Sequence, residues 1–464
     1  MNLKSGCRRP PYRSLMLAAL LTGLCLASQA QEAPVAENSA GGAITLFQNV
    51  RIFDGRSRAL SAPSNVLVKG NIIERIAVAP IDVAANADAH VIAGNGRVLM
   101  PGLIDAHWHA YMAATSQVLL STADPAYLQL LAARQAEATL LRGFTTVRDL
   151  GGPVFGLKRA IDEGVMIGPR IYPSGAMISQ TSGHGDFRFS FELPRSPGGP
   201  LSNSEMQGVA AIADSPDEVR LRAREQLRLG ASQIKLMGGG GVSSQLNPIE
   251  STQYTEAELR AAVEAAENWG TYVAVHAYTP RSIRQAVAAG VKCIEHGQLI
   301  DEPTARLLAE KGIWWSLQPL AYDAAIFAQM TPVSQKKAQQ VWAGTDNAYK
   351  LAKKYKVRTA WGADILFNAD AASRQGSYLA GMVRWYTPAE ALSMATADNG
   401  ELLALSGFIN PYPGKLGVVE EGALADLLLV DGNPLENIKL VEDPDRNFVV
   451  IMKDGRIYKN ALGR

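Results

Sequence analysis

Cysteine is nearly absent from this sequence, with three residues in 464. Two of them, Cys7 and Cys25, lie near the N-terminus, which leaves Cys293 alone in the rest of the chain. A single cysteine cannot form a disulfide within the chain, so the fold must be stabilised by its core or by a bound metal ion. Cys293 lies in an apolar stretch, where we expect a small buried hydrophobic residue.

The chain also lacks a charge excess and, beyond its start, a long hydrophobic run. It is 47% hydrophobic and 19% charged, which is typical of a globular protein and argues against disorder or a membrane bundle. Its 45 basic and 44 acidic residues nearly balance. Nucleic acid is therefore not an expected partner.

The first 30 residues differ in composition from the rest of the chain. Residues 1–30 place four basic residues before an apolar run at 15–27 and small residues at 27–30. This pattern is typical of a secretory signal peptide; the alternative is a membrane anchor, but the run is short for a bilayer span. We expect cleavage, an exported protein that is periplasmic or secreted, a disordered lead-in at 31–43, and no membrane span in the mature chain.

Long helical patterns are missing at both ends of the mature chain. Residues 44–98 show short alternating runs between glycines, and the same strand-and-turn pattern returns at 416–464. Neither segment is long enough to bury a core by itself. We therefore expect one small β-sandwich domain built from both ends.

Between these ends, one unit recurs: an amphipathic helix, a glycine and a short apolar strand. The helix at 126–142, for example, precedes a strand at 144–149, and the capping-box spacing of Ser215 with Glu218 and of Thr255 with Glu258 begins two further helices. Eight such strands can be counted, starting with the run at 98–110. The sequence therefore predicts an α/β fold with a (β/α)8 TIM barrel over 99–415.

Polar residues close several of these apolar strands. They are His107, His109, Lys235, His276, His296 and Asp364. Barrel enzymes build their sites at the carboxyl ends of the strands, so these side chains should point into one volume. His107 and His109 leave the same face of a strand and can share one metal ion, while the other residues supply further ligands.

Lys235 is unusual among metal ligands because an ammonium group repels cations. It faces the predicted barrel interior, where desolvation favours the neutral amine. A neutral amine can add carbon dioxide to give a carbamate, an anion able to bridge two metals. The alternative is an ordinary lysine that pairs with an internal carboxylate.

The order of these residues and the motifs around them resemble the amidohydrolase superfamily. The motifs are PGLIDAHWHA, TTVRDLGG, QIKLMGGGGV, VAVHAYTPRSIRQAVAAGVKCIEHG and GKLGVVEEGALADLLLVDGNP. More narrowly, the chain is similar to the metal-dependent branch of Xaa-Pro dipeptidase-like, carboxypeptidase-like and ochratoxin-hydrolysing enzymes. The resemblance covers nearly all of the chain after the leader.

This resemblance implies a role for each strand-end residue. His107 and His109 would hold one divalent metal, His276 and His296 a second, and Lys235 would be the bridging N6-carboxylated lysine. Asp364 would bind the first metal and accept the proton of the attacking water. Zinc suits this donor set best. Relatives in this branch often form large homo-oligomers, so the resemblance also implies a homo-oligomer, such as an octamer, for this chain.

Three further residues are candidates for substrate contact. His184 lies in a glycine-flanked loop and Tyr278 shares a face with His276; the resemblance implies that both contact the substrate, although either residue can also serve packing. Arg148 ends the second strand and either binds a substrate carboxylate or pairs internally with Asp149 or Asp364.

The four glycines at 238–241 lack the Lys-Ser/Thr of a phosphate loop. We therefore expect no organic cofactor here, and we expect these glycines to allow close backbone approach or lid motion. His90 is expected on the surface.

Two classes of function remain open. The first is a binuclear metallohydrolase that cuts an amide and releases a C-terminal amino acid from dipeptides or N-acyl amino acids, including ochratoxin A (to ochratoxin alpha and phenylalanine). Its rivals on the same metals are a lactonase or phosphotriesterase and a cyclic amidase. The second class is a non-catalytic periplasmic binding protein. The presence of both Lys235 and Asp364 favours the enzyme.

Overall fold

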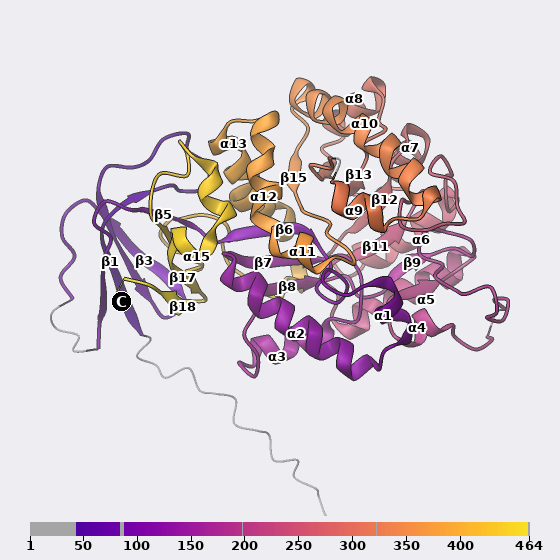
Figure 1. Cartoon of the computed structure of the whole chain (residues 1–464), viewed down its shortest axis with the longest axis horizontal. Helices are drawn as coiled ribbons and strands as arrows, with labels where there is room; N and C mark the ends of the chain where they lie inside the picture. Colours follow the sequence, from indigo (N-terminus) through magenta and orange to yellow (C-terminus); the bar gives the residue numbers. More distant parts are fainter. Residues whose placement is uncertain (1–42, 84–87, 197, 322, 463–464) are drawn as a thin grey trace, which may run out of the picture. The chain divides into compact units, whose positions relative to one another are not determined.

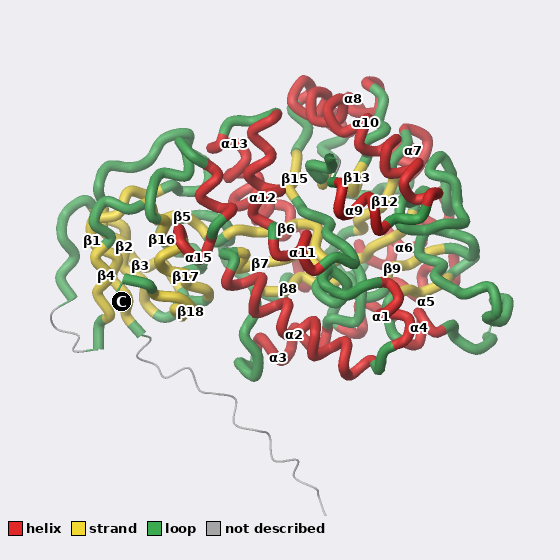
Figure 2. The backbone as a smooth tube through the Cα atoms, viewed as in Figure 1, coloured by secondary structure: helices red, strands yellow, loops and turns green. Residues whose placement is uncertain are grey.

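The computed structural model describes residues 43–83, 88–196, 198–321 and 323–462. The predicted signal peptide and nearly all of the lead-in lie outside these residues. The described part has mixed α/β structure, with helices and strands alternating along the middle of the chain (Figure 2). None of its helices is long and apolar enough to cross a membrane.

Strands from both ends of the chain pair in one mixed sheet. Its order is β18-β17-β16-β5-β1-β2-β3, with β4 beside β1. The two ends meet where β5 runs antiparallel to β16, with Leu99 opposite Leu429. Both residues belong to a buried hydrophobic cluster with Phe47 and Val450. The strands are β1 (Ile44–Ile52), β2 (Ser64–Lys69), β3 (Ile72–Ala77), β4 (His90–Ala93), β5 (Val98–Pro101), β16 (Leu427–Val430), β17 (Phe448–Lys453) and β18 (Arg456–Asn460).

The other strands of the described residues form two parallel sheets. One has the order β6-β7-β8, and the other has the order β10-β9-β11-β12-β13-β14-β15. Their strands are β6 (Leu103–Trp108), β7 (Phe144–Asp149), β8 (Arg170–Pro173), β9 (Met177–Ser179), β10 (Ala210–Ile212), β11 (Ile234–Met237), β12 (Val273–Ala277), β13 (Cys293–His296), β14 (Trp314–Leu317) and β15 (Thr359–Trp361). The eight strands predicted from the sequence are all present, whereas β9 and β10 were not predicted.

Backbone hydrogen bonds join the two parallel sheets at two places. The Asp364 N–H, just after β15, donates to the His107 carbonyl on β6 at 2.9 Å. The Ser232 N–H, just before β11, donates to the Pro173 carbonyl at the end of β8 at 2.8 Å. The two sheets are therefore neighbours along both of these borders.

The opening strand predicted at 98–110 is in fact two strands. The chain leaves the mixed sheet after β5 and enters the parallel sheet at β6, with Gly102 between them. A Cβ atom at Gly102 would lie only 2.1 Å from the Thr145 hydroxyl oxygen, so only glycine fits this crossing. The apolar run in the sequence continues through the junction, which is why it was predicted as one strand.

The helices mostly precede the parallel strands and pack outside them (Figure 1). They are α1 (Gln117–Thr122), α2 (Pro125–Leu141), α3 (Phe155–Asp162), α4 (Asn203–Met206), α5 (Pro216–Leu229), α6 (Glu256–Glu267), α7 (Pro280–Ala288), α8 (Glu302–Glu310), α9 (Ala324–Gln329), α10 (Pro332–Tyr355), α11 (Ala369–Ser373), α12 (Gln375–Ala380), α13 (Pro388–Ser393), α14 (Asn399–Leu403) and α15 (Pro444–Asn447). Four short 3-10 or π segments are η1 (Gly381–Arg384), η2 (Met394–Asp398), η3 (Ala404–Ile409) and η4 (Ile438–Glu442).

Of the two predicted capping boxes, one is complete. Thr255 and Glu258 satisfy each other's backbone amides at the start of α6. At α5 the Ser215 side chain accepts from the Glu218 N–H, but the Glu218 carboxylate accepts from Asp214 instead of Ser215. The predicted hydrogen bond from the Ser215 N–H to the Glu218 carboxylate is therefore wrong, whereas the predicted bond from the Glu218 N–H to the Ser215 hydroxyl is confirmed.

A buried ion pair links the parallel strands to the mixed sheet. Arg170, at the start of β8, donates to Asp426 at 3.0 Å and to Asp454 at 2.7 Å. The side chains of Arg170 and Asp426 are 7% and 3% exposed. The charges of this pair are therefore satisfied by each other rather than by water.

We expect Arg170→Met to lower the free energy of unfolding by about 3–5 kcal/mol, because the variant leaves Asp426 buried without its cation. The measurement is urea unfolding followed by intrinsic fluorescence. Arg159→Met is the matched control, since Arg159 pairs with Glu163 on the exposed surface of α3. Equal shifts of the two unfolding midpoints would contradict the assignment.

Candidate metal and active site

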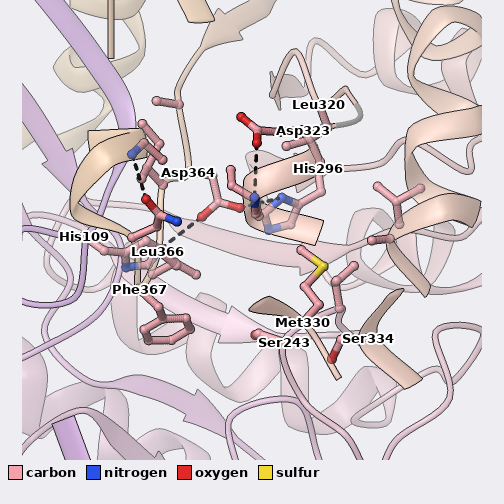
Figure 3. Close-up of a pocket in the computed structure, with 18 of the residues that line it drawn as sticks. His109, Ser243, His296, Leu320, Asp323, Met330, Ser334, Asp364, Leu366 and Phe367 are labelled. Atoms are coloured by element: carbon pink, nitrogen blue, oxygen red, sulfur yellow. Dashed lines mark hydrogen bonds and ion pairs between the residues drawn. The ribbon is translucent and has the colours of Figure 1, made fainter. Parts of the chain in front are cut away.

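A cavity of about 790 Å³ lies at the carboxyl ends of the parallel strands. Among the residues that line it are eight of the nine predicted site residues: His107, His109, His184, Lys235, His276, Tyr278, His296 and Asp364. The ninth, Arg148, does not line it. In Figure 3 the Asp364 carboxylate lies between His109 and His296, with Ser243, Met330 and Ser334 further along the wall.

His107, His109 and Asp364 bring their electron-pair donors together, and we refer to them as the His–Asp cluster. The Nε2 atoms of His107 and His109 lie 3.3 Å and 3.4 Å from the Asp364 Oδ1 atom. The opposite nitrogens, Nδ1, lie against the Glu295 carboxylate at 2.8 Å and the Gly151 carbonyl at 3.4 Å. Because each Nδ1 atom faces an acceptor, both Nε2 atoms are left to face the carboxylate and to bind a cation beside it.

This arrangement fits a cation. Asp364 Oδ1 is buried and has no hydrogen-bond partner within the described structure. The candidate ligand atoms of the three residues lie within 4.8 Å of one another. Imidazole nitrogens and carboxylate oxygens are common ligands of divalent transition metals. The His–Asp cluster is therefore a candidate metal site.

Burial and charge set the ionisation of the cluster. Burial lowers the pKa of His107 well below its usual value, so its ring is neutral. Burial alone would raise the pKa of Asp364, but His107, His109 and Lys235 hold it below its usual value. A neutral imidazole and an ionised carboxylate are the forms that bind metal.

The backbone at two of these residues is strained. His296 and Asp364 have φ of 73° and 49°, in the left-handed region that residues with a side chain rarely adopt. Gly362 allows the close approach behind Asp364, because a Cβ there would lie 2.5 Å from the His107 Cβ. Such strain is commonly found at functional sites.

A second group of site residues lies beside the cluster. The rings of His276 and His296 are 4.4 Å apart between centroids. Each donates one ring N–H to a fixed acceptor: His276 Nε2 to the Gly240 carbonyl at 3.0 Å, and His296 Nδ1 to Gln318 Oε1 at 2.8 Å. Burial lowers the pKa of both rings, so each is neutral with one free lone pair.

Lys235 lies on β11, 1% exposed, and its side chain reaches the cavity. Among the residues that the structure describes, none accepts a hydrogen bond from it. Burial lowers the pKa of the Lys235 amine to about 8. The structure therefore places a buried amine with no hydrogen-bond partner next to the histidines.

His184 and Tyr278 are also brought to the site. The His184 ring is 4.3 Å from the His276 ring, and its Nδ1 is 2.7 Å from the Ser244 hydroxyl. A Cβ at Gly241 would lie 2.0 Å from His184 Cε1, so this glycine provides the close approach expected of the 238–241 run. The Tyr278 ring lies 5.0 Å and 5.1 Å from the rings of His276 and His296.

Arg148 is not available to a substrate. Its side chain is 0% exposed and donates to Glu295 at 2.7 Å and to the Ala106 carbonyl at 2.6 Å. The predicted substrate contact is therefore corrected to an internal ion pair, and its partner is Glu295 rather than Asp149 or Asp364. Cys293 is buried as expected, and its thiol also donates to Glu295 at 3.0 Å.

Glu295 and Gln318 were missed by the sequence analysis. Glu295 joins Arg148 to His107, and Arg148 holds the pKa of Glu295 below its usual value although burial would raise it. Gln318 follows β14 directly and orients His296. Applying the strand-end rule to the seventh predicted strand would have identified Gln318. His90 lies exposed on β4, as expected.

Two buried aspartates hold the backbone around the His–Asp cluster. Asp105 accepts from the N–H groups of His107 and Ala363 at 3.0 Å and 3.1 Å. Asp149 accepts from the N–H of Ala110 at 2.7 Å. Burial raises the pKa of Asp105 to about 7 and that of Asp149 to about 6. Both carboxyl groups therefore fix the backbone of the segments that carry His107, His109 and Asp364.

Comparison with known proteins identifies the family. The model of the amidohydrolase family matches residues 98–458. Ochratoxinase from Aspergillus niger is 33% identical over 379 residues, which is 78% of this chain and 76% of that protein. Its crystal structure superposes with a TM-score of 0.78 at 29% identity, covering 90% of this chain and 96% of that one.

Two dipeptidase structures are also similar. A prolidase complexed with N-methylphosphonate-L-proline is 34% identical with a TM-score of 0.81, covering 90% of this chain and 100% of that one. A Xaa-Pro dipeptidase with bound methionine is 29% identical with a TM-score of 0.79 and the same coverage.

The chain belongs to the amidohydrolase family. It is a hydrolase of the kind that acts on amide bonds, and it carries a His-His-Asp group of the type that holds a metal in this metal-dependent family.

We expect Glu295→Gln to weaken zinc binding by about 10- to 100-fold, because the neutral amide orients His107 less firmly and leaves Arg148 without a counter-charge. The measurement is zinc affinity by competition with a chromogenic chelator. Glu310→Gln, at the exposed end of α8, is the control. Unchanged zinc affinity in a folded Glu295 variant would show that Glu295 does not orient His107.

Proposed function

We propose that this protein is a binuclear metal-dependent amidohydrolase that releases a C-terminal amino acid from dipeptides or N-acyl amino acids. The observation that carries the proposal is the His–Asp cluster, with its unpartnered Asp364 oxygen, next to His276, His296 and Lys235 in one cavity. The similarity to an ochratoxinase and to two dipeptidases supports amide cleavage.

We propose further that strands β6 to β8 and β11 to β15 close into a (β/α)8 barrel over 99–415. The bonds from Asp364 to His107 and from Ser232 to Pro173 support this closure, since they join the two parallel sheets along two borders. Only residues 174–176 separate β8 from β9, and β9 pairs with β11. The mixed sheet, whose strands lie within 44–101 and 427–460, would then be the β-sandwich domain that the sequence predicts from 44–98 and 416–464.

The donor set suits two divalent ions, with zinc the best match. His107, His109 and Asp364 would hold one ion, and His276 and His296 the other. Lys235 as a carbamate would supply oxygens to both and remove the unpaired positive charge from the buried site. When bound, the ions would polarise the amide carbonyl and lower the pKa of the attacking water.

The residues of this chain then have separate tasks. Asp364 is ionised and accepts the proton of the attacking water; it then returns that proton to the leaving nitrogen, because an amine leaves poorly unless protonated. His184 and Tyr278 line the same cavity and would orient the amide carbonyl and the terminal carboxylate of the substrate.

The substrate class follows from the cavity wall. Beyond the polar floor, apolar residues form much of the wall, among them Leu320, Met330 and Phe367 (Figure 3). Ile326 and Trp342 line it as well. The volume lies within the range of about 300–1,000 Å³ typical of pockets for drug-sized ligands. We therefore propose bulky, apolar acyl groups, including that of ochratoxin A.

We also propose a cellular location and an oligomeric state for the enzyme. The basic and apolar pattern of residues 1–30 supports an exported, periplasmic or secreted protein. We propose a homo-oligomer, on the resemblance to this branch of the family.

We expect the zinc-loaded protein to hydrolyse N-acyl amino acids and dipeptides, and to convert ochratoxin A to ochratoxin alpha and phenylalanine. The experiment is a panel of these compounds with lactones, cyclic amides and phosphotriesters, followed by mass spectrometry of the products. Chelator-treated protein is the control. Activity confined to lactones, cyclic amides or phosphotriesters would refute the assignment, and binding without turnover would indicate a binding protein.

We expect Asp364→Asn to lower kcat by about 10²- to 10⁴-fold, because an amide side chain cannot accept the proton. The zinc content should change much less, since His107 and His109 remain. The measurement combines turnover of the best substrate with zinc analysis of the purified variant. Asp370→Asn, on the exposed side of α11, is the control. Normal turnover by the Asp364 variant would exclude the proposed proton transfer.

A further inference from the structure

Lys337, on helix α10, is a buried cation that lies outside the predicted site. It is 7% exposed, and its ammonium group donates to three backbone carbonyls, those of Gly241 at 3.2 Å, Ser244 at 2.6 Å and Asn247. An ammonium group has three N–H donors, so these three carbonyls can satisfy it fully. All three belong to residues 241–247, which we refer to as the clamped loop.

The clamped loop reaches His184 through Ser244. The Ser244 hydroxyl lies 2.7 Å from His184 Nδ1, and Asn247 donates to the same hydroxyl at 2.8 Å. Asn247 also accepts from the Gly241 N–H at 3.1 Å. The same short segment therefore carries both the three carbonyls bound by Lys337 and the hydroxyl that fixes the His184 ring.

The outer side of the clamped loop is open to solvent. Leu246, on this side of the loop, is 92% exposed. The inner side faces α10, which contributes Ser334 to the cavity wall while the clamped loop contributes Ser243 (Figure 3). Lys337 is thus a point at which the helix and the clamped loop are held together behind that wall.

We infer that Lys337 is a positioning residue that acts through Ser244 on His184. Without the ammonium group, the carbonyls of Ser244 and Asn247 would lose their donor, and that of Gly241 would keep only the Ser244 hydroxyl at 3.3 Å. The clamped loop would then have to move for these carbonyls to reach water. Ser244 would move with it, and His184 would lose its fixed orientation toward the substrate. This inference rests on the proposed function, in which His184 contacts the substrate.

The test compares Lys337→Met with Lys336→Met, which alters the neighbouring exposed lysine on the same helix. For the best amide substrate, we expect Lys337→Met to lower kcat/KM by about 10- to 100-fold, mainly through KM. Lys336→Met should leave kcat/KM unchanged within about twofold. Zinc content should be the same in both variants, because neither lysine contacts a proposed ligand.

A double variant separates positioning from general destabilisation. If Lys337 acts through His184, adding Lys337→Met to His184→Ala should change kcat/KM by less than about twofold. A full additional loss in the double variant, or loss of zinc in Lys337→Met, would overturn the inference.

Hydrogen exchange tests the same contact without relying on any activity. Peptides covering 238–248 and 181–187 should exchange about tenfold faster or more in Lys337→Met, with no change in Lys336→Met. If the protein hydrolyses none of the amides tested but these segments still exchange faster in Lys337→Met, the proposed function would be refuted, whereas the contact between Lys337 and the clamped loop would be confirmed. Unchanged exchange in these two segments, or loosening throughout the chain, would refute the clamp.

Discussion

The constraint on which the site depends is that several electron pairs converge with no proton between them. His107 and His109 direct their Nε2 atoms at one oxygen of Asp364, and that oxygen has no hydrogen-bond partner in the described structure. Two lone pairs and a carboxylate repel one another in a buried site unless a cation lies among them. The strands around the His–Asp cluster therefore arrange these atoms as a cation-binding site.

The surrounding structure keeps the ring protons out of this volume. Each of the four strand-end histidines has an acceptor on its other nitrogen: Glu295 for His107, Gly151 for His109, Gly240 for His276 and Gln318 for His296. Burial lowers the pKa of His107, His276 and His296, so these three rings remain neutral. Orientation and protonation are thus controlled by the same hydrogen bonds.

Burying these groups is unfavourable, and the structure offsets the cost by pairing them. Glu295 and Arg148 neutralise each other at 0% exposure, while Asp105 and Asp149 accept backbone amides beside the ligands. Lys235 is the exception, since it has no hydrogen-bond partner among the described residues and a pKa of about 8. An amine that is easily neutralised at this position supports the proposed carbamate at Lys235, which would restore the charge balance.

Sequence reasoning succeeded where the determining interactions are local. The alternation of side chains along a strand and the position of strand ends predict that His107, His109, Lys235, His276, His296 and Asp364 meet, and they line one cavity. The failures concern partners that are distant in sequence. For Arg148 the sequence left open a substrate contact or an internal pair with Asp149 or Asp364, but its partner is Glu295, 147 residues away on another strand.

The same limit applies to the junction at Gly102 and to Lys337. The apolar run through Gly102 has no break in composition, so nothing local indicates that the strand changes sheets there. Lys337 has the sequence context of any lysine on an amphipathic helix, and it binds carbonyls 90 to 96 residues earlier in the chain, at Gly241, Ser244 and Asn247.

The floor and the wall of the cavity are built by different parts of the chain. The floor consists of strand ends, whose geometry is tied to the parallel sheets and cannot vary without loss of the His–Asp cluster. Much of the wall comes from α9, α10 and the segment between β14 and α9, which include Leu320, Ile326 and Trp342. These helices can change their side chains without disturbing the strand ends. A hydrolase built in this way can therefore keep one reaction while the residues of the wall determine its substrate range. For this reason the proposal of a bulky acyl group is based on the wall residues and not on the proposed metal ligands.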